Sequence, residues 1–194
     1  MGKYVSVPQV VLISCYELGH QPFNLASPMA ILAEAGVSAT GVDLSVEDLS
    51  EYAEEISAAQ FIGFSVPMHT ALRVGYSALS RVRALNLEAH ICFYGIYAEL
   101  NADYLLSGIA DSVIAGEYEV ALLESVQSVL VNRFDPFVPP ANVRTRECVR
   151  TPAIVRVPFV QPQRSGLPSL ENYARFQRDG ELSLAGYTET TRGC

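Results

Sequence analysis

Lysine and tryptophan are the residues that this sequence most clearly lacks. It has no tryptophan and one lysine, Lys3, and its 13 Lys and Arg stand against 21 Asp and Glu, which gives a formal net charge of −8. Nucleic acids and anionic membranes attract clustered basic side chains, so neither is an expected partner. No stretch reaches about 18 consecutive apolar residues, and the amino terminus has no basic region followed by a long apolar one, so the sequence predicts neither a membrane span nor export.

Cysteine is also sparse, and its spacing excludes two further classes of protein. Cys15, Cys92, Cys148 and Cys194 lie far apart along the chain and form no closely spaced pair. Such spacing predicts neither a disulfide framework nor a complete zinc site. We therefore expect a reducing, cytoplasmic setting.

The composition changes after Asn132. Residues 1–132 carry 4 basic and 15 acidic side chains, whereas residues 133–194 carry 9 basic and 6 acidic ones, and 7 of the 11 prolines lie in the second part. Proline interrupts regular elements and suits a linker or an arm that crosses a surface. We expect one domain over residues 1–132 and a proline-rich arm over residues 133–194.

Short apolar runs alternate with helical patterns in the first part. Continuous runs of this length are typical of strands that are covered on both faces. Ser45–Asp48 resembles a capping box at the start of a second helix, and apolar residues from Met68 to Leu85 recur every three or four positions. The alternation predicts an α/β fold, a doubly wound, five-stranded parallel sheet of the flavodoxin-like or Rossmann-like type. The predicted strands are residues 10–13, 39–44, 61–64, 90–93 and 112–115.

The arm gives weaker signals. Residues 143–149 and 153–160 predict a β-hairpin around residues 150–152. Residues 169–178, which follow Pro168, predict a short helix, and residues 183–190 predict a further strand.

Ligands of an open parallel sheet bind outside the carboxyl ends of its strands, where the strand order reverses. A 2-1-3-4-5 order brings the loops after the first and third strands together, with the loops after the fourth and fifth strands beside them. Polar, aromatic and glycine residues are concentrated in these loops, so we take them as the candidate ligand-binding residues. They are Cys15, Tyr16, Glu17 and His20; Ser65, Val66, Pro67, Met68, His69 and Thr70; Tyr94, Gly95 and Ile96; and Gly116, Glu117, Tyr118 and Glu119.

The first of these loops does not suit the common small cofactors. It holds one glycine, Gly19, where a dinucleotide needs a Gly-x-Gly-x-x-Gly turn. A flavin phosphate needs a turn rich in Ser, Thr and Gly, which residues 16–18 do not supply. A phosphoacceptor domain needs acidic residues at the ends of the first and third strands, where Cys15 and Ser65 stand.

The loops instead resemble those of cobalamin-binding domains found at the amino end of radical S-adenosylmethionine (SAM) enzymes. Residues 63–70, Gly-Phe-Ser-Val-Pro-Met-His-Thr, look like the serine-containing turn that holds the nucleotide tail of cobalamin, and residues 116–119, Gly-Glu-Tyr-Glu, are similar to a Gly-Glu-Gly-Glu turn in which Tyr118 replaces a glycine. Residues 186–194, Gly-Tyr-Thr-Glu-Thr-Thr-Arg-Gly-Cys, look like the run into a Cys-x-x-x-Cys-x-x-Cys loop, and residues 162–168 with Tyr173 resemble the connector before it.

The resemblance covers nearly the whole chain and implies a role for each part. It implies that the candidate residues bind cobalamin. It implies that Cys194 is the first thiolate ligand of a four-iron four-sulfur cluster, which binds and cleaves SAM in a longer parent protein. The implied partner is the radical SAM barrel of that parent, without which the chain is inactive. Apolar side chains on the arm, Phe134, Phe137 and Phe159, also predict association between copies or disorder of the arm.

The resemblance has one departure, and two other functions stay open. Many cobalamin domains carry Asp-x-His-x-x-Gly, whose histidine binds cobalt, but the corresponding positions here are Cys15, Glu17 and His20. One alternative is a cobalamin-free scaffold or substrate-recognition domain of a radical SAM protein. The other is a stand-alone flavodoxin-like protein that binds a different small ligand. Methyl transfer to an unreactive carbon by the parent is implied by the family alone.

Overall fold

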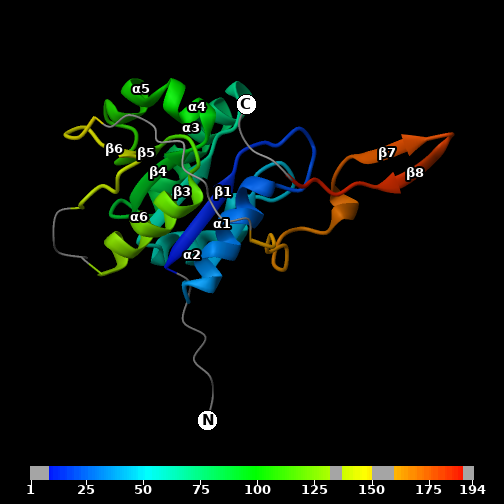
Figure 1. Ribbon diagram of the computed structural model, residues 1–194, viewed down its shortest axis with the longest axis horizontal. Coiled ribbons are helices and arrows are strands. Elements are labelled where there is room, and N and C mark those ends of the chain that lie inside the picture. Colours follow the sequence, from blue (N-terminus) through cyan, green and yellow to red (C-terminus); the bar gives the residue numbers. More distant parts are fainter. Residues whose placement is uncertain (1–8, 132–136, 150–159, 190–194) are drawn as a thin grey trace, which may run out of the picture.

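The structure is a computed structural model that describes residues 9–131, 137–149 and 160–189. Its centre is a six-stranded sheet with the order β2-β1-β3-β4-β5-β6, in which the first five strands are parallel and β6 is antiparallel to β5 (Figure 1). The strands are β1 (Val10–Ser14), β2 (Ala39–Asp43), β3 (Phe61–Ser65), β4 (His90–Tyr94), β5 (Ser112–Ile114) and β6 (Val143–Arg144).

The doubly wound fold predicted from the apolar runs is confirmed, together with the order of its five parallel strands. The sixth strand was not predicted as part of this sheet. Val143–Arg144 pairs with β5 and extends the sheet at its edge, whereas the sequence placed residues 143–149 in a hairpin with residues 153–160. Of that second half, residues 153–159 lie outside the described residues. A two-residue strand next to prolines is too short to produce a periodic signal of its own.

Helices cover both faces of the sheet. α1 (Phe23–Glu34) and α6 (Glu119–Val131) pack on one face. The other face carries α2 (Ala53–Ala58), which follows the 3-10 turn η1 (Leu49–Tyr52), together with α3 (His69–Leu85), α4 (Ile96–Leu100) and α5 (Ala102–Leu106). Within the described residues, no helix has both the length and the hydrophobicity that crossing a membrane requires.

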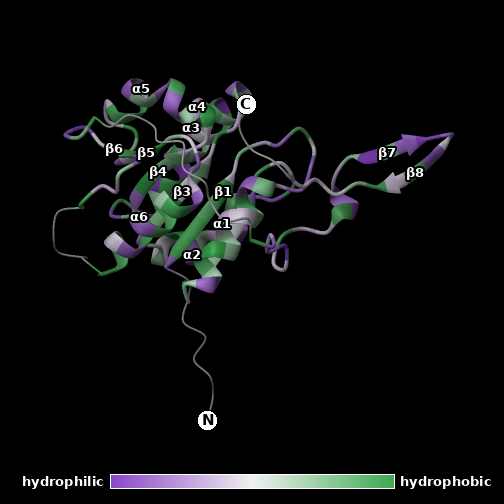
Figure 2. Cartoon of the chain, in the orientation of Figure 1, coloured by the Kyte–Doolittle hydropathy of each residue, from purple (hydrophilic) through white to green (hydrophobic). Residues whose placement is uncertain are grey.

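Each parallel strand supplies both layers of the core. Successive side chains of a strand point to opposite faces, so Leu12 and Cys92 face α1 and α6, while Ile13 and Phe93 face α3. All four are buried. The strands are accordingly hydrophobic along most of their length, as Figure 2 shows, and this is why continuous apolar runs identified them.

The helices on the second face follow the sequence pattern with one shift. α3 buries one side along its length, as its spacing of three and four residues predicts, and its buried residues are Ala71, Leu72, Gly75, Ala78, Leu79 and Val82. No helix begins directly after Ser45; the predicted second helix begins at Leu49 instead, as the 3-10 turn η1. Asp48 itself caps η1, because its Oδ1 accepts a hydrogen bond from the Ser50 backbone N–H at 2.8 Å, and the Ser45 hydroxyl donates to Asp43.

The arm contains a second, two-stranded sheet, whose hairpin the sequence did not predict. A 3-10 turn, η2 (Leu170–Asn172), precedes the antiparallel hairpin of β7 (Arg175–Arg178) and β8 (Glu181–Leu184), which projects from the body of the molecule (Figure 1). The predicted helix over residues 169–178 is therefore wrong beyond that turn, and the predicted strand at 183–190 begins earlier and ends at Leu184. Asp179 and Gly180 have φ values of 50° and 85°, which suit the tight turn that Asp-Gly pairs favour.

Candidate functional site

Four loops leave the sheet along one edge. The register places Ser14, Ser65, Tyr94 and Ile114 side by side at the last positions of β1, β3, β4 and β5. The loops that follow these residues therefore meet at one edge of the sheet, which we call the carboxyl edge. The structure thus brings the candidate loops together as the strand order predicts, whereas the binding role of their residues stays a prediction.

Cys15 begins the first loop and turns away from solvent. It is 2% exposed, and its sulfur lies 2.9 Å from the position that a Cβ on Gly75 would take, so α3 packs closely against it. Burial, with the charges of Asp43 and Glu17 nearby, holds the pKa of the Cys15 thiol well above its usual range. A protonated, enclosed thiol is neither a nucleophile nor a ready metal ligand, so Cys15 contributes packing.

Glu17 occupies the amino end of α1. Its carboxylate oxygens accept hydrogen bonds from the backbone N–H groups of Phe23, at 2.9 Å, and Asn24, at 3.2 Å. Burial raises the pKa of Glu17 to about 8, against the lowering effect of those two hydrogen bonds. The amino end of a helix is a place where phosphate groups bind, and here a carboxyl group of the chain itself takes that place.

The two histidines of the carboxyl edge lie in different surroundings. His20 is partly buried and stacks on Tyr187 of the arm, with 5.7 Å between ring centroids, and its Nδ1 is buried with no hydrogen-bond partner among the described residues. His69 is exposed at the first position of α3 and meets Tyr97 edge-on at 6.3 Å. Across residues 9–131, 137–149 and 160–189, no three His, Cys, Asp or Glu side chains are grouped so that they could hold a metal ion. Cys194 lies outside those residues.

The loops after β3 and β4 touch each other through a glycine. Gly95 has a φ of 105°, and a Cβ there would stand 3.1 Å from the carbonyl oxygen of Val66, so only glycine fits without strain. Val66 is buried, Pro67 and Met68 are half-buried, and Thr70 is exposed.

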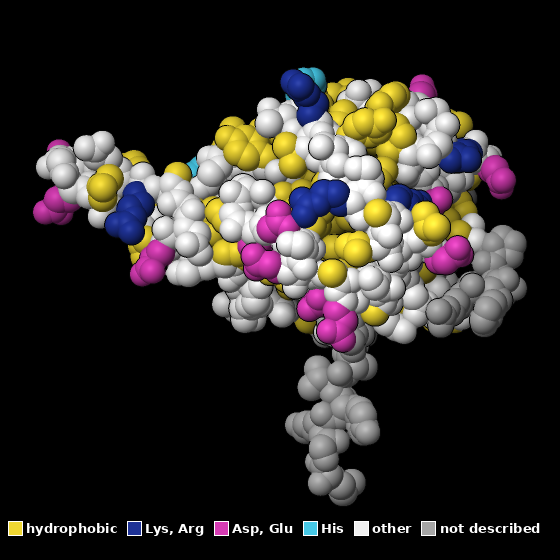
Figure 3. All heavy atoms as spheres, turned by 180° about the vertical axis from the view of Figure 1, so that it is seen from behind, with side chains coloured by type: hydrophobic (Ala, Val, Ile, Leu, Met, Phe, Trp, Pro, Cys, Tyr) yellow, Lys and Arg dark blue, Asp and Glu magenta, His cyan; other side chains and the backbone are white. Residues whose placement is uncertain are grey.

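The outer surface of the carboxyl edge carries exposed apolar side chains. Leu18 is 63% exposed and Ile96 is 65% exposed, and Met68 is half-buried between the loops. Exposed apolar residues continue along the helices on the α3 side, at Tyr76, Leu100 and Tyr104. Figure 3 shows hydrophobic side chains at the upper edge of the molecule, where Figure 1 places α3, α4 and α5.

Beneath the carboxyl edge, two tyrosines fill the space between the strand ends and α1. Tyr94 is fully buried and Tyr118 is 8% exposed, and their ring centroids lie 4.9 Å apart. The Tyr94 hydroxyl donates to the backbone oxygen of Asn24 at 2.9 Å, and the Tyr118 hydroxyl donates to Asn24 Oδ1 at 2.5 Å. We call Tyr94, Tyr118 and Asn24 the tyrosine cluster.

The Gly-Glu-Tyr-Glu turn holds one side of this cluster in place. Gly116 has a φ of 66°, a value that favours glycine, and the chain then turns inward. Glu117 is half-buried. Glu119 is 1% exposed and accepts a hydrogen bond from the Ser27 hydroxyl at 2.8 Å, which ties the start of α6 to α1.

The arm covers the part of the carboxyl edge nearest β2. Tyr173 is buried and donates its hydroxyl hydrogen to Asp43 Oδ2 at 2.8 Å, and the Ala174 backbone N–H donates to the Gly19 carbonyl at 2.9 Å. Arg164 donates to Gln21 Oε1 at 2.8 Å. Sequence reasoning missed Asp43 and Gln21, although an aspartate that directly ends an apolar strand was a usable signal.

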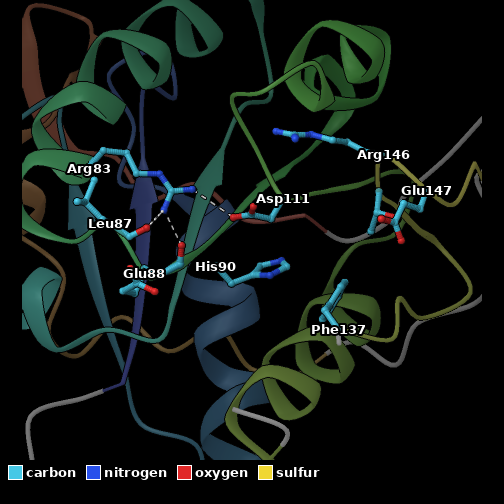
Figure 4. Close-up of a pocket in the computed structure, with 10 residues that line it drawn as sticks. Arg83, Leu87, Glu88, His90, Asp111, Phe137, Arg146 and Glu147 are labelled. Atoms are coloured by element: carbon cyan, nitrogen blue, oxygen red, sulfur yellow. Dashed lines mark hydrogen bonds and ion pairs between the residues drawn. The ribbon is translucent and has the colours of Figure 1, made fainter. Parts of the chain in front are cut away.

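A cavity of about 510 Å³ lies at the opposite end of the sheet, beside the first residue of β4 (Figure 4). His90 lines it, stacked on Phe61 at 5.4 Å and tilted against Phe137 at 4.5 Å. Its Nε2 lies 2.7 Å from the Ser112 hydroxyl. Burial is the main cause that lowers the pKa of His90 to about 4, so the ring is neutral at neutral pH.

Arg83 forms the other wall of this cavity. Its guanidinium donates to the carbonyl oxygens of Leu87, at 3.0 Å, and Ala89, at 2.8 Å, and to Asp111 Oδ2 at 3.2 Å. Arg146 reaches toward the cavity from the segment after β6 (Figure 4). Sequence reasoning did not find this hollow, because its lining comes from segments that are far apart in the chain.

The fold resembles part of TsrM, a radical SAM methyltransferase from Kitasatospora setae. A structure of TsrM with cobalamin and a [4Fe-4S] cluster bound matches 75% of this chain and 31% of the TsrM chain, with a TM-score of 0.59 and 17% sequence identity. A structure with tryptophan substrate and the SAM analog aza-SAM bound matches 74% and 30%, with a TM-score of 0.60 and 18% identity. This chain therefore spans about a third of the length of TsrM, and the likeness supports the α/β fold. No protein-family model and no curated protein matches the sequence.

Proposed function

We propose that this chain is the corrinoid-binding α/β region of a longer radical SAM protein, and that the corrin ring lies over the carboxyl edge. The observation that carries the proposal is the meeting of four loops at that edge, on a fold shared with TsrM. Leu18, Met68 and Ile96 present apolar side chains there, and a corrin ring offers broad apolar faces for them to contact.

The residues of the edge fit one part of cobalamin and not another. A ring that lies on the outer surface of the carboxyl edge meets the exposed apolar side chains of Leu18 and Ile96. A nucleotide tail between the strand ends and α1 does not fit, because the tyrosine cluster fills that space. When bound, cobalamin supplies an organometallic cobalt centre that can carry a methyl group. The role of this chain is to bind and orient the ring.

The second cofactor is proposed from the sequence alone. Residues 186–194 end in Arg-Gly-Cys, and in the proposed parent Cys194 is the first ligand of a [4Fe-4S] cluster that binds SAM. The parent then carries cysteines at the fourth and seventh positions after Cys194. Reading the parent gene tests this, and other residues at those two positions would favour the stand-alone small-ligand binder. Methyl transfer to an unreactive carbon is the reaction that we propose for the parent.

A titration with hydroxocobalamin, followed by visible absorption, tests the main proposal. We expect a saturable change in the spectrum, because the ring leaves water for an apolar surface. Ile96→Glu places a charge on the carboxyl edge and is expected to weaken binding by about tenfold or more. Leu87→Glu is the matched control, because Leu87 is also strongly exposed, at 76%, but lies beside the cavity at the other end of the sheet. No saturable change, or equal weakening by both variants, would contradict the proposal.

The tyrosine cluster favours a second candidate function. A domain whose space beneath the carboxyl edge is filled could have lost the cofactor and kept the fold as a scaffold, which docks onto the rest of the parent or recognises its substrate. If the chain is such a scaffold, the hydroxocobalamin spectrum should stay unchanged at all protein concentrations. The same titration therefore separates the two functions.

A further inference from the structure

Small residues line one face of the sheet just below the carboxyl edge. Ser14 and Ser65 end β1 and β3 side by side, and Gly63 lies two positions before Ser65. All three are buried and face α1 and α6, since their strand neighbours Leu12 and Phe61 belong to that side of the core. Residues this small leave a depression in the sheet surface, which another group must fill.

The ring of Tyr94 fills this depression. Its Cε1 lies 3.2 Å from the position that a Cβ on Gly63 would take, and Leu12 Cδ2 lies 2.9 Å from it, so a larger residue at position 63 would press on both side chains. Tyr118 packs beside it, and both hydroxyls bond to Asn24 at the start of α1. Moving either ring outward would break a hydrogen bond in a buried setting and open a void, so the filled arrangement is strongly favoured.

We infer that this chain holds a corrinoid by its ring alone, with the nucleotide tail outside the space between the sheet and α1, because Tyr94 and Tyr118 occupy that space. The inference rests on the proposed function, since it concerns how the same site takes its ligand. A tail that carries a bicyclic base, a ribose and a phosphate is much larger than one phenol ring. It cannot enter while the tyrosine cluster stays in place.

The first loop also offers no side chain that would replace the base of the tail as a ligand to cobalt. Cys15 is buried on the α3 side, and Glu17 is engaged with two backbone N–H groups of α1. One face of the His20 ring stacks on Tyr187 of the arm, and its Nδ1 is buried. The base at the end of the tail therefore stays free to remain on cobalt, and binding shifts the spectrum only by the move of the ring from water to an apolar surface, without loss of the base.

Comparing cobalamin with cobinamide, a corrinoid that has no nucleotide tail, tests the inference on the unmodified chain. We expect the two dissociation constants to agree within about threefold, because the tail makes no contact beneath the edge. Bound methylcobalamin should show the small shift caused by the change of surroundings, without the larger change that loss of the base from cobalt produces. Cobalamin that binds about tenfold tighter than cobinamide, with the base displaced from cobalt, would overturn this inference and leave the proposed function intact. Binding of neither corrinoid would overturn the proposed function, and this inference with it.

Two substitutions at one position sharpen the test. Tyr118→Gly removes a ring from the cluster and restores Gly-Glu-Gly-Glu, and it should favour cobalamin over cobinamide by about tenfold relative to the unmodified chain. Tyr118→Phe keeps the ring and loses only the hydroxyl, so it should leave the ratio unchanged. An unchanged ratio in a folded glycine variant, with folding checked by circular dichroism, would count against the inference. The comparison on the unmodified chain needs no variant to fold.

Discussion

The space at one end of the sheet is filled by side chains, whereas the other end holds a cavity, although β4 contributes to both ends. β4 ends in Tyr94, whose ring fills the space beneath the carboxyl edge, and begins with His90, which lines a cavity of about 510 Å³. Both side chains point to the face that α1 and α6 cover, because they are four positions apart in a strand. Topology thus selects the edge where the loops meet, but the sizes of side chains on neighbouring strands decide where a hollow exists.

The largest expected effect is on stability at the filled end. Tyr94→Ala removes a fully buried ring and its hydrogen bond to Asn24, and we expect a loss of about 4–5 kcal/mol in the free energy of unfolding. Phe137→Ala at the open end removes a half-buried ring and should cost about 1 kcal/mol. Urea unfolding at one pH measures both losses. Equal losses would mean that the two ends are equally well packed.

Glu17 gives the carboxyl edge a pH dependence of its own. Its pKa is about 8 in the fold against 4.5 for an unperturbed glutamate, so between these values the folded chain binds more protons than the unfolded chain. The Glu17 contribution to stability is therefore present at pH 4.5 and is lost as the pH rises toward 8, by about 3–4 kcal/mol in total. Glu17→Gln keeps an oxygen for the Phe23 N–H and does not titrate.

Unfolding measurements at several pH values check this expectation. The stability of the Glu17→Gln variant relative to the unmodified chain should rise steadily between pH 4.5 and 8. A difference that stays constant over this range would show that Glu17 keeps an ordinary pKa despite its burial.

His90 should give the stability of the protein the opposite pH dependence, at the end of the sheet that holds the cavity. Its pKa falls from 6.5 to about 4 on burial, so between these values the unfolded chain binds more protons than the folded chain. Its contribution to stability is lost as the pH falls from 6.5 to 4, by about 2–3 kcal/mol. The unmodified chain should therefore gain stability over His90→Gln as the pH rises from 4 to 6.5. Parallel curves for the two proteins would place the His90 ring in water.

The fold was predictable where one residue type dominated a whole segment. Most residues of β1, β3, β4 and β5 are apolar, and α3 repeats its apolar residues every three or four positions, so local patterns carry their assignment. β6 has two residues, and its pairing with β5 depends on contacts across the chain. The β7–β8 hairpin carried a usable signal in Asp179-Gly180, whereas the helix expected over the same residues had only Pro168 to support it.

The candidate site was predictable in position and not in shape. The meeting of four loops follows from strand order alone, and the structure has that order. The filling of the space beneath them depends on Tyr94 lying across Gly63, and this contact depends on the register between β3 and β4. Register is not visible in a single sequence when both strands are apolar throughout. The arm contacts at Asp43 and Gln21 were hidden for a similar reason, since their partners lie more than 120 residues away.

The arm contacts the first loop and β2 at the carboxyl edge through Tyr173 and Ala174, and the first of these contacts gives the smallest expected effect. Tyr173→Phe removes the hydroxyl that donates to the buried Asp43, so we expect a loss of about 1–2 kcal/mol. Tyr187→Phe is the control, because its hydroxyl donates to Glu189 at 3.2 Å in an exposed setting, and we expect a loss below about 0.5 kcal/mol. Thermal or urea unfolding measures both losses.

Hydrogen exchange then shows whether Tyr173→Phe loosens only the carboxyl edge of the sheet or both of its ends. The Ala174 amide bonds to the Gly19 carbonyl and should exchange faster in Tyr173→Phe, because the arm is held less firmly to the first loop. The Ile91 amide bonds to Asp111 beside the open cavity and should keep its rate. Acceleration at both amides would mean that the arm stabilises the whole sheet, and the contrast between its two ends would then lie in their packing alone.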